Sequence, residues 1–268
     1  MKNVNFYNPI DSKLRVWKDY TLVMPCIAIG NVGQLSVDLL ISTMLRDKKC
    51  QLVGRIHSRS LQSVAGPNAF NHEDPNLTTT CEVYEIPEKH LVVIQIRAPP
   101  YKERRKLFIK EFSDWIQACQ FKTALTLTSG LRPFLNPAIR DRTLFRFLTT
   151  SPCQEEFVEN FIDKTQITKL SSDIFVTSRS ITGLDFAGAG YARLFYREWE
   201  SRGMNALFII LFCSEGDNLP EAYAMVNKLD AYLNLSEGPS NPEPRIEWKP
   251  PVSWSSFYGK KVPQEINE

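Results

Sequence analysis

The segment Ala206–Cys213, with the sequence ALFIILFC, is the longest uninterrupted apolar stretch of the chain. It is far shorter than the ~20 apolar residues that a membrane helix needs. Its isoleucines and phenylalanines favour a strand, and a strand without polar alternation is buried on both faces. The chain must therefore supply helices for both faces of a sheet.

Strand and helix patterns alternate along the rest of the chain, as this arrangement requires. We expect strands at 20–29, 51–57, 80–86, 90–97, 123–128 and 174–177, and helices at 32–47, 107–119, 157–162, 191–199 and 220–235. This order predicts an α/β fold, a three-layer α/β/α sandwich with a mainly parallel sheet. We expect residues 1–268 to form a single domain, with an amino-terminal extension at 1–19 and an extended carboxyl-terminal tail at 238–268.

Composition and charge exclude several classes of protein. The 268 residues are 43% hydrophobic and 23% charged, which is ordinary for a globular protein with a sizeable core. A formal net charge of +2 is too small to indicate nucleic acid or an anionic membrane as a partner. The six cysteines form no CxxC pair, and residues 1–19 lack the apolar segment of a secretory signal. These features favour a cytoplasmic and nuclear protein.

Two glycine-containing loops could hold an anion or only turn the chain. The loop Gly30-Asn31-Val32-Gly33-Gln34-Leu35 lacks the lysine and hydroxyl of a phosphate loop and the third glycine of a dinucleotide fingerprint. Its Asn31 and Gln34 instead have the spacing of a helix capping box. The second loop, FAGAGY at 186–191, could form a nest of amides, with Arg193 as the nearby cation. A tight turn is the simpler interpretation of both.

Candidate residues for catalysis and metal binding are few. No serine lies in a Gly-x-Ser-x-Gly elbow, and His72-Glu73-Asp74 lacks a second histidine at zinc spacing. Glu215 and Asp217 follow the strand Ala206–Cys213, where α/β enzymes place ligands. They predict either acid–base chemistry or a cap for the next helix, and a cap is simpler. The alternative function is thus a small-molecule enzyme, phosphorylase-like or hydrolase-like, that uses Glu215, Asp217 and His57 in loops at the strand ends.

Basic residues cluster within and just before the helix expected at 107–119. They are Lys102, Arg104, Arg105, Lys106 and Lys110. A solvated helix face is the usual interpretation. Together with Arg140, Arg142 and Arg146 these residues could form a positive surface for an acidic protein partner, where long basic side chains mainly steer encounter.

Several short motifs follow one another along the chain. They are Met24-Pro25 with Ile29-Gly30-Asn31-Val32-Gly33-Gln34-Leu35 and Asp38-Leu39-Leu40-Ile41-Ser42-Thr43, then Glu82-Val83-Tyr84, Phe145-Arg146-Phe147-Leu148, Ser214-Glu215-Gly216-Asp217-Asn218 with Pro220, and Pro250-Pro251-Val252-Ser253-Trp254. In these motifs the sequence resembles the proteasome assembly chaperone 2 family over most of residues 21–263. The first and fourth motifs are the most specific, and residues 133–180 match least well.

The resemblance implies a non-enzymatic chaperone with a three-layer α/β/α fold and no cofactor or metal. It implies a heterodimer with proteasome assembly chaperone 1 that binds α-subunits of the 20S proteasome, promotes α-ring assembly and prevents off-pathway α-ring association. Some members of the family end in a hydrophobic residue, a tyrosine and any residue, and this tail enters pockets between α-subunits. Here Ile266, Asn267 and Glu268 stand at those positions without the tyrosine, so we expect the partner chaperone to supply the aromatic anchor.

Overall fold

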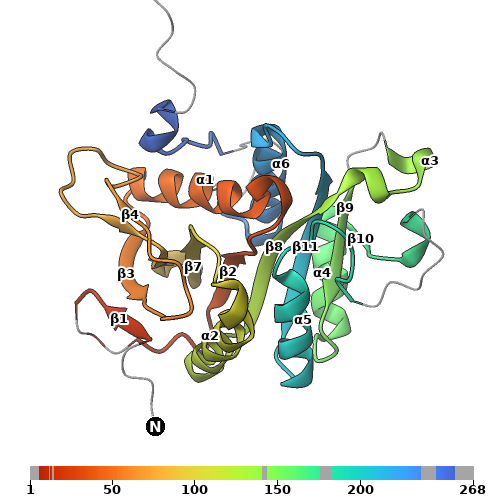
Figure 1. Cartoon of the computed structure of the whole chain (residues 1–268), viewed down its shortest axis with the longest axis horizontal. Helices are drawn as coiled ribbons and strands as arrows, with labels where there is room; N and C mark the ends of the chain where they lie inside the picture. Colours follow the sequence, from red (N-terminus) through yellow and green to blue (C-terminus); the bar gives the residue numbers. More distant parts are fainter. Residues whose placement is uncertain are drawn as a thin grey trace, which may run out of the picture.

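The computed structural model describes residues 6–11, 13, 15–140, 144–175, 183–236 and 246–256. In these residues a nine-stranded sheet has the order β1-β3-β6-β7-β2-β8-β11-β9-β10, and β4 and β5 form a separate ribbon (Figure 1). The strands are β1 (Tyr7–Pro9), β2 (Thr21–Pro25), β3 (Gln51–Ile56), β4 (Ala65–Gly66), β5 (Thr78–Thr79), β6 (Cys81–Ile86), β7 (Leu91–Ile96), β8 (Thr123–Leu131), β9 (Phe145–Thr149), β10 (Thr168–Lys169) and β11 (Ala206–Cys213). The helices are α1 (Val32–Arg46), α2 (Arg105–Cys119), α3 (Pro137–Arg140), α4 (Glu155–Thr165), α5 (Ala192–Ser201) and α6 (Leu219–Leu233).

The centre of the sheet is parallel. β7, β2, β8 and β11 run in one direction, and β11 pairs with β8 from Ala206 opposite Ala124 to Cys213 opposite Leu131. Every residue of β11 is buried, as its sequence predicts. Antiparallel strands extend this centre through β6, β3 and β1 on one side and through β9 on the other.

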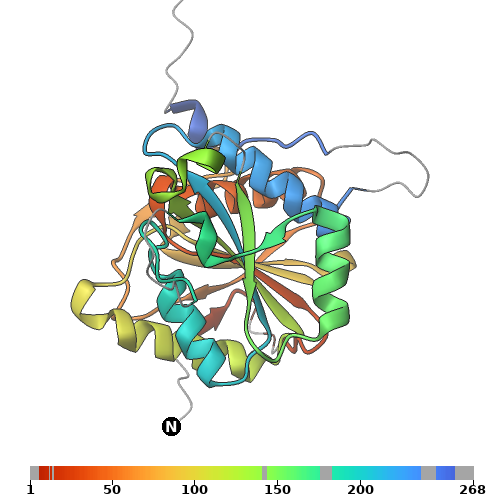
Figure 2. The same cartoon turned by 90° about the vertical axis from the view of Figure 1, so that its right-hand side faces the viewer.

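Helices cover both faces of the sheet. α6 packs against α1 and α4 on one face, and α2 packs against α5 on the other. Figure 2 shows the strands fanning through the middle, with α6 and α4 on one side and α2 and α5 on the opposite side. Alternate residues of β11 serve the two layers: Leu207 and Ile209 lie in the core beneath α1 and α6, and Phe208 and Ile210 in the core beneath α2 and α5. The structure thus confirms the predicted three-layer α/β/α sandwich.

One predicted strand is wrong in its described part. Ser172–Ile174 forms a short 3-10 helix, and residues 176–182 lie outside the described residues. Ile174 and Phe175 are apolar because they pack into the core, at 3% and 8% exposure, and not because they belong to the sheet. The sequence patterns predict neither β1, at one edge of the sheet, nor β9, which lies between β11 and the edge strand β10.

The amino-terminal segment is integrated into the domain. β1 pairs antiparallel with β3, and the side chain of Trp17 is 2% exposed between β1 and α2. Among the described residues, no helix is both long enough and apolar enough to cross a membrane.

Candidate functional site

The loops at the carboxyl ends of the parallel strands fill one another's space. Gly30 has a φ of 68°, and a Cβ at this position would lie 2.5 Å from Nδ2 of Asn218. The amide of Ile29 donates to the carbonyl of Gly188 at 3.0 Å, so the two glycine loops of the sequence bind each other. The loop at Gly30 therefore turns a corner against protein, and its close contacts explain why glycine stands there.

The predicted capping box at the start of α1 is wrong. Asn31 has a left-handed backbone, with a φ of 52°, and its side chain makes no cap hydrogen bond. Gln34 instead reaches across to β7, where its Nε2 donates to the carbonyl of Ile96 at 2.9 Å. The side chain of Gln95 returns a hydrogen bond to the carbonyl of Gln34, also at 2.9 Å. The side chain of Gln34 therefore links α1 to the sheet and does not cap the helix.

The structure does not bring the candidate catalytic residues together. Asp217 Oδ1 accepts the amide of Leu219 at 3.1 Å, so this carboxylate satisfies one amide at the start of α6, in keeping with the simpler interpretation. His57 is exposed at the end of β3, and β3 is separated from β11 by four strands. Five strand spacings of ~4.8 Å place His57 about 24 Å from Glu215 and Asp217. Among the described residues, no group of three or more His, Cys, Asp and Glu side chains could hold a metal ion.

A strap, residues 246–256, crosses the outer surface of α1 and α6. Trp248 is 6% exposed, and its Nε1 donates to Oδ1 of Asn227 on α6 at 2.7 Å. The amide of Lys249 donates to Thr43 Oγ1 on α1 at 2.9 Å, and its ammonium pairs with Asp47 at 2.6 Å. The strap therefore links the two helices of this layer.

The same strap also fixes the long loop between β3 and β6. The amide of Ser253 donates to the carbonyl of Ala69 in that loop at 3.1 Å, and Trp254 beside it is 7% exposed. Arg46, at the end of α1, donates to the carbonyl of Pro250 at 2.9 Å. Helix, loop and strap thus meet around Arg46.

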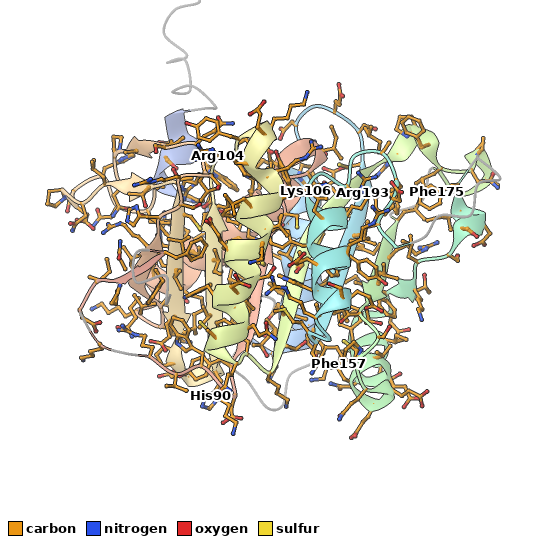
Figure 3. All side chains as sticks on the ribbon, turned by 60° about the horizontal axis from the view of Figure 1, so that its bottom comes forward. His90, Arg104, Lys106, Phe157, Phe175 and Arg193 are labelled. Atoms are coloured by element: carbon orange, nitrogen blue, oxygen red, sulfur yellow. The ribbon has the colours of Figure 1, made fainter. Side chains whose placement is uncertain are left out.

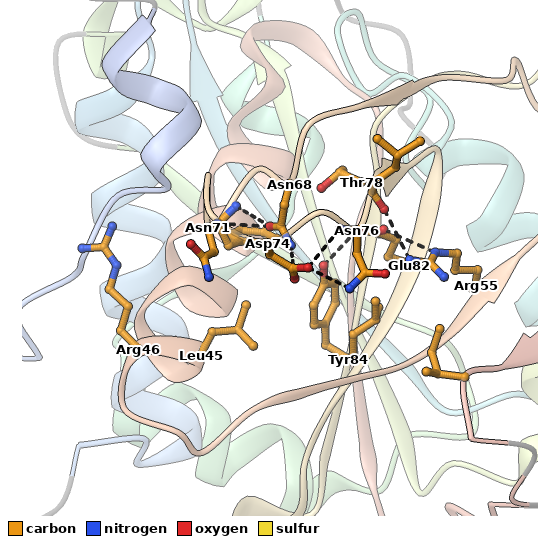
Figure 4. Close-up of a pocket in the computed structure, with 14 residues that line it drawn as sticks. Leu45, Arg46, Arg55, Asn68, Asn71, Asp74, Asn76, Thr78, Glu82 and Tyr84 are labelled. Atoms are coloured by element: carbon orange, nitrogen blue, oxygen red, sulfur yellow. Dashed lines mark hydrogen bonds and ion pairs between the residues drawn. The ribbon is translucent and has the colours of Figure 1, made fainter.

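Two pockets adjoin at Arg46. The first, of about 520 Å³, lies between the strap and α6, and its lining residues are Arg46, His72, Leu219, Tyr223, Pro250, Pro251, Val252, Trp254 and Ser255. The second, of about 680 Å³, lies between the end of α1, the strands β3 and β6, and the long loop (Figure 4). Ile10 and Leu77 line this second pocket and are 49% and 54% exposed. Arginine, tyrosine and tryptophan with apolar side chains at the edge form the mixture that protein interfaces favour.

The wall of the second pocket holds a buried carboxylate. Glu82 is 1% exposed, accepts the hydroxyl of Tyr84 at 2.8 Å and the amide of Thr79 at 3.0 Å, and lies 3.8 Å from Nε of Arg55. Burial raises the pKa of Glu82 despite these favourable partners, and burial beside Glu82 raises the pKa of Tyr84 well above its usual value.

Asparagine and aspartate side chains order the loop over this pocket. Oδ1 of Asn68 accepts the amides of Phe70 and Asn71 at 2.9 and 3.1 Å. Asp74 accepts the amide of Asn76 at 2.9 Å and the side chain of Asn68 at 2.8 Å. The cluster His72-Glu73-Asp74 thus contributes a turn-forming aspartate, and His72 lines the neighbouring pocket.

The remaining predicted residues fall in several places. Lys102, Arg104, Arg105, Lys106 and Lys110 are exposed at and near the start of α2. Arg146 lies on β9, beyond β11, where its guanidinium donates to the carbonyl of Phe145 at 2.7 Å, so it does not join them. Arg142, the side chain of Arg140 and the tail residues Ile266, Asn267 and Glu268 lie outside what the structure describes.

These observations define an α/β/α protein whose described strand ends are filled by its own loops and whose open pockets lie beneath a surface loop and a strap. The chain belongs to the PAC2 family, whose sequence profile matches residues 22–236.

Related proteins of known name align with nearly the whole chain. Proteasome assembly chaperone 2 of Xenopus tropicalis is 30% identical over 263 residues, which cover 96% of this chain and 98% of the relative. The protein of the same name from Danio rerio is 32% identical, with 92% and 94% of the two chains covered. Among solved structures, Pyrococcus furiosus PbaB, described as an archaeal proteasome activator, superposes with a TM-score of 0.60 at 16% identity and covers 87% of this chain and 91% of its own. That last similarity supports the fold alone.

Proposed function

We propose that this protein is an assembly chaperone of the 20S proteasome. The observation that carries the proposal is the end-to-end similarity to proteins named Proteasome assembly chaperone 2, together with membership of the PAC2 family. The separation of Glu215 and Asp217 from His57 gives the enzymatic alternative no support.

In its detailed form, the proposal is that the chain pairs with proteasome assembly chaperone 1 in the cytoplasm and nucleus. The heterodimer binds α-subunits, promotes α-ring assembly and prevents off-pathway association of α-rings. The two pockets around Arg46 are the proposed contact region, because they combine aromatic and basic side chains with the exposed apolar residues Ile10 and Leu77. The candidate tail contact at Ile266, Asn267 and Glu268 stays a prediction.

Reconstitution tests this function. Recombinant α-subunits are mixed with the purified chain, with proteasome assembly chaperone 1, or with both, and the products are separated by native electrophoresis and weighed by native mass spectrometry. We expect both chaperones together to increase single α-rings at the expense of misassembled rings. Unchanged ring products in every mixture would refute the proposal.

A matched pair of variants tests the contact region. Leu77→Glu places a charge at the edge of the second pocket, whereas Val16→Glu makes the same change at a 70% exposed site that does not line either pocket. We expect Leu77→Glu to weaken the chaperone complex about tenfold or more, since a charge buried in an interface is costly, and Val16→Glu to leave it unchanged. Equal effects would place the contact elsewhere.

A further inference from the structure

The helices α2 and α5 begin together at the carboxyl end of the sheet. Near their starts, the hydroxyl of Tyr191 donates to the carbonyl of Pro100 at 3.4 Å. Near their ends, Arg202 of the α5 side pairs with Asp114 of α2 at 2.7 Å. The two helices therefore run in the same direction, and side chains from their first turns share one surface.

That surface is strongly basic. The exposed cations are Lys102, Arg104, Arg105 and Lys106 before and within the first turn of α2, Arg193 in the first turn of α5, and Arg197 one turn further along α5. They outnumber the acidic residues beside them, Glu103 and Asp185. Figure 3 shows Lys106 and Arg193 close to each other at the same end of the two helices. Arg193 and Arg197 both pair with Asp185, at 2.6 and 3.4 Å.

A cleft of about 590 Å³ lies within this basic surface. Its walls include Arg105 and Lys106 from α2 and Arg193 from α5, and the half-buried side chains of Tyr191 and Leu194 also line it. The cleft thus combines cationic walls with an aromatic ring and an aliphatic side chain.

Helix stability does not explain these charges. The partial positive charge at a helix N-terminus favours acidic side chains in the first turn. α4 follows this rule with Glu155 and Glu156, and α6 follows it with Glu221, whereas the first turn of α1 is uncharged. α2 and α5 have no acid in the first turn, and both carry cations there. A negatively charged ligand would offset the resulting repulsion.

We propose that the cleft between α2 and α5 binds an acidic segment of a partner protein. Carboxylates of that segment pair with Arg105, Lys106 and Arg193, and an apolar side chain packs against Tyr191 and Leu194. Nucleic acid fits less well, because the chain has a formal net charge of only +2. The proposal is independent of the proteasome role and of the pockets around Arg46.

The test measures fluorescence anisotropy of a labelled synthetic peptide titrated with the full chain at low ionic strength. The peptide consists of aspartate and glutamate around a central leucine, and a second peptide replaces these acids with asparagine and glutamine. We expect binding of the acidic peptide only, with affinity that falls as salt is added. The double variant Arg105→Ala, Lys106→Ala should weaken binding about tenfold, since two charge pairs are lost.

Two further variants make the result specific. Lys18→Ala with Lys122→Ala removes the same charge from exposed sites at the opposite end of the sheet and should leave the affinity unchanged. Asp185→Asn should strengthen binding about twofold to threefold, because it frees Arg193 and Arg197 from an internal competitor. Circular dichroism melting curves confirm that each variant is folded.

Several results would overturn the proposal. These are no binding of the acidic peptide at low salt, equal binding of the neutral peptide, or an equal loss in the Lys18, Lys122 control. Tighter binding of a single-stranded oligonucleotide or of a phosphoserine peptide at the same cleft would assign it to another class of ligand.

Discussion

The two helical layers are closed by opposite ends of the chain, and by different chemistry. On the α2 and α5 side, the amino-terminal segment adds Phe6, Tyr7 and Trp17 to a continuous group of aromatic rings. On the α1 and α6 side, the strap at 246–256 buries Trp248 and Trp254, is tied to the helices by hydrogen bonds, and leaves two pockets beside it. The first closure resembles core, whereas the second resembles an interface that still has room for a partner.

Trp17 shows how the amino-terminal closure stabilises the fold. Its ring stacks on Phe121, with centroids 5.6 Å apart and an interplanar angle of 10°, and meets Trp115 edge-on at 6.1 Å. Its Nε1 donates to Glu85 at 2.9 Å, so the one polar atom of the ring is satisfied.

The largest effect is expected for Trp17→Ala. A buried tryptophan replaced by alanine leaves a cavity and should lower the free energy of unfolding by about 3–5 kcal/mol. Urea denaturation followed by circular dichroism measures the loss. Val16→Ala, one residue away and 70% exposed, is the control and should stay within about 0.5 kcal/mol of the wild type. If Trp17→Ala lost no more stability than the control, the amino-terminal segment would not be part of the core as described.

Trp248→Ala should lower the free energy of unfolding by less, about 2 kcal/mol. The strap can detach while the sheet and helices remain packed. Hydrogen exchange provides a second readout. The amides of Lys249 and Ser253, which donate to Thr43 and Ala69, should lose protection in the variant while β11 keeps it. If the variant loses as much stability as Trp17→Ala, the two closures do not differ as described.

The buried Glu82, in the wall of the second pocket, should make the stability of the protein depend on pH. Its folded pKa is raised, so the folded state holds the proton more tightly than the unfolded chain does. The wild type should therefore lose stability as the pH rises from the pKa of Glu82 in the unfolded chain through its raised pKa in the folded protein. Glu82→Gln keeps one acceptor oxygen for the amide of Thr79, and its NH2 group can donate to the hydroxyl oxygen of Tyr84 in place of accepting from it. The variant should be the more stable protein at neutral pH, with no difference below about pH 4.

Urea denaturation at a series of pH values measures this difference. The exposed Glu88, on the hairpin turn, offers the same substitution as a control, and Glu88→Gln should follow the wild type across the range. A Glu82→Gln variant that is less stable than the wild type at neutral pH would show that its carboxylate charge is needed.

Arg46→Ala should have the smallest effect on stability, below about 1 kcal/mol, because an exposed hydrogen bond contributes little. The same variant should weaken the chaperone complex, since Arg46 lines both pockets. Lys18→Ala, also an exposed cation, is the control. Thermal melting and native mass spectrometry separate the two effects, and a destabilised variant with full binding would assign Arg46 to the fold alone.

The sequence predicts the regular elements well and the closures poorly. Apolar periodicity predicts β11, α1, α2 and α6, because each element buries a face wherever it packs. β9, with the sequence FRFLT, escapes the prediction because Arg146 interrupts a short apolar run. Local spacing predicts a helix cap for Gln34, but its side chain bonds to the carbonyl of Ile96, which is remote in sequence.

The candidate contact region depends even more on residues distant in sequence. Arg46 and Pro250 are 204 positions apart, and no local pattern joins them. The aromatic residues of the proline-rich tail indicate that this segment packs on the domain, because Trp248 and Trp254 need apolar surface to cover. Asp38 gave another, because an acid within the apolar pattern of α1 needs a buried partner. That partner is Arg97, at 2.9 Å.

The most direct test of a surface-acting chaperone is affinity purification of the tagged full chain from cells in which proteasome assembly has been arrested. We expect 20S α-subunits and a second, related chaperone to co-purify, their yield to rise on arrest, and Leu77→Glu to lower this yield while Val16→Glu does not. Recovery of the chain without α-subunits, under arrest and without it, would contradict the account.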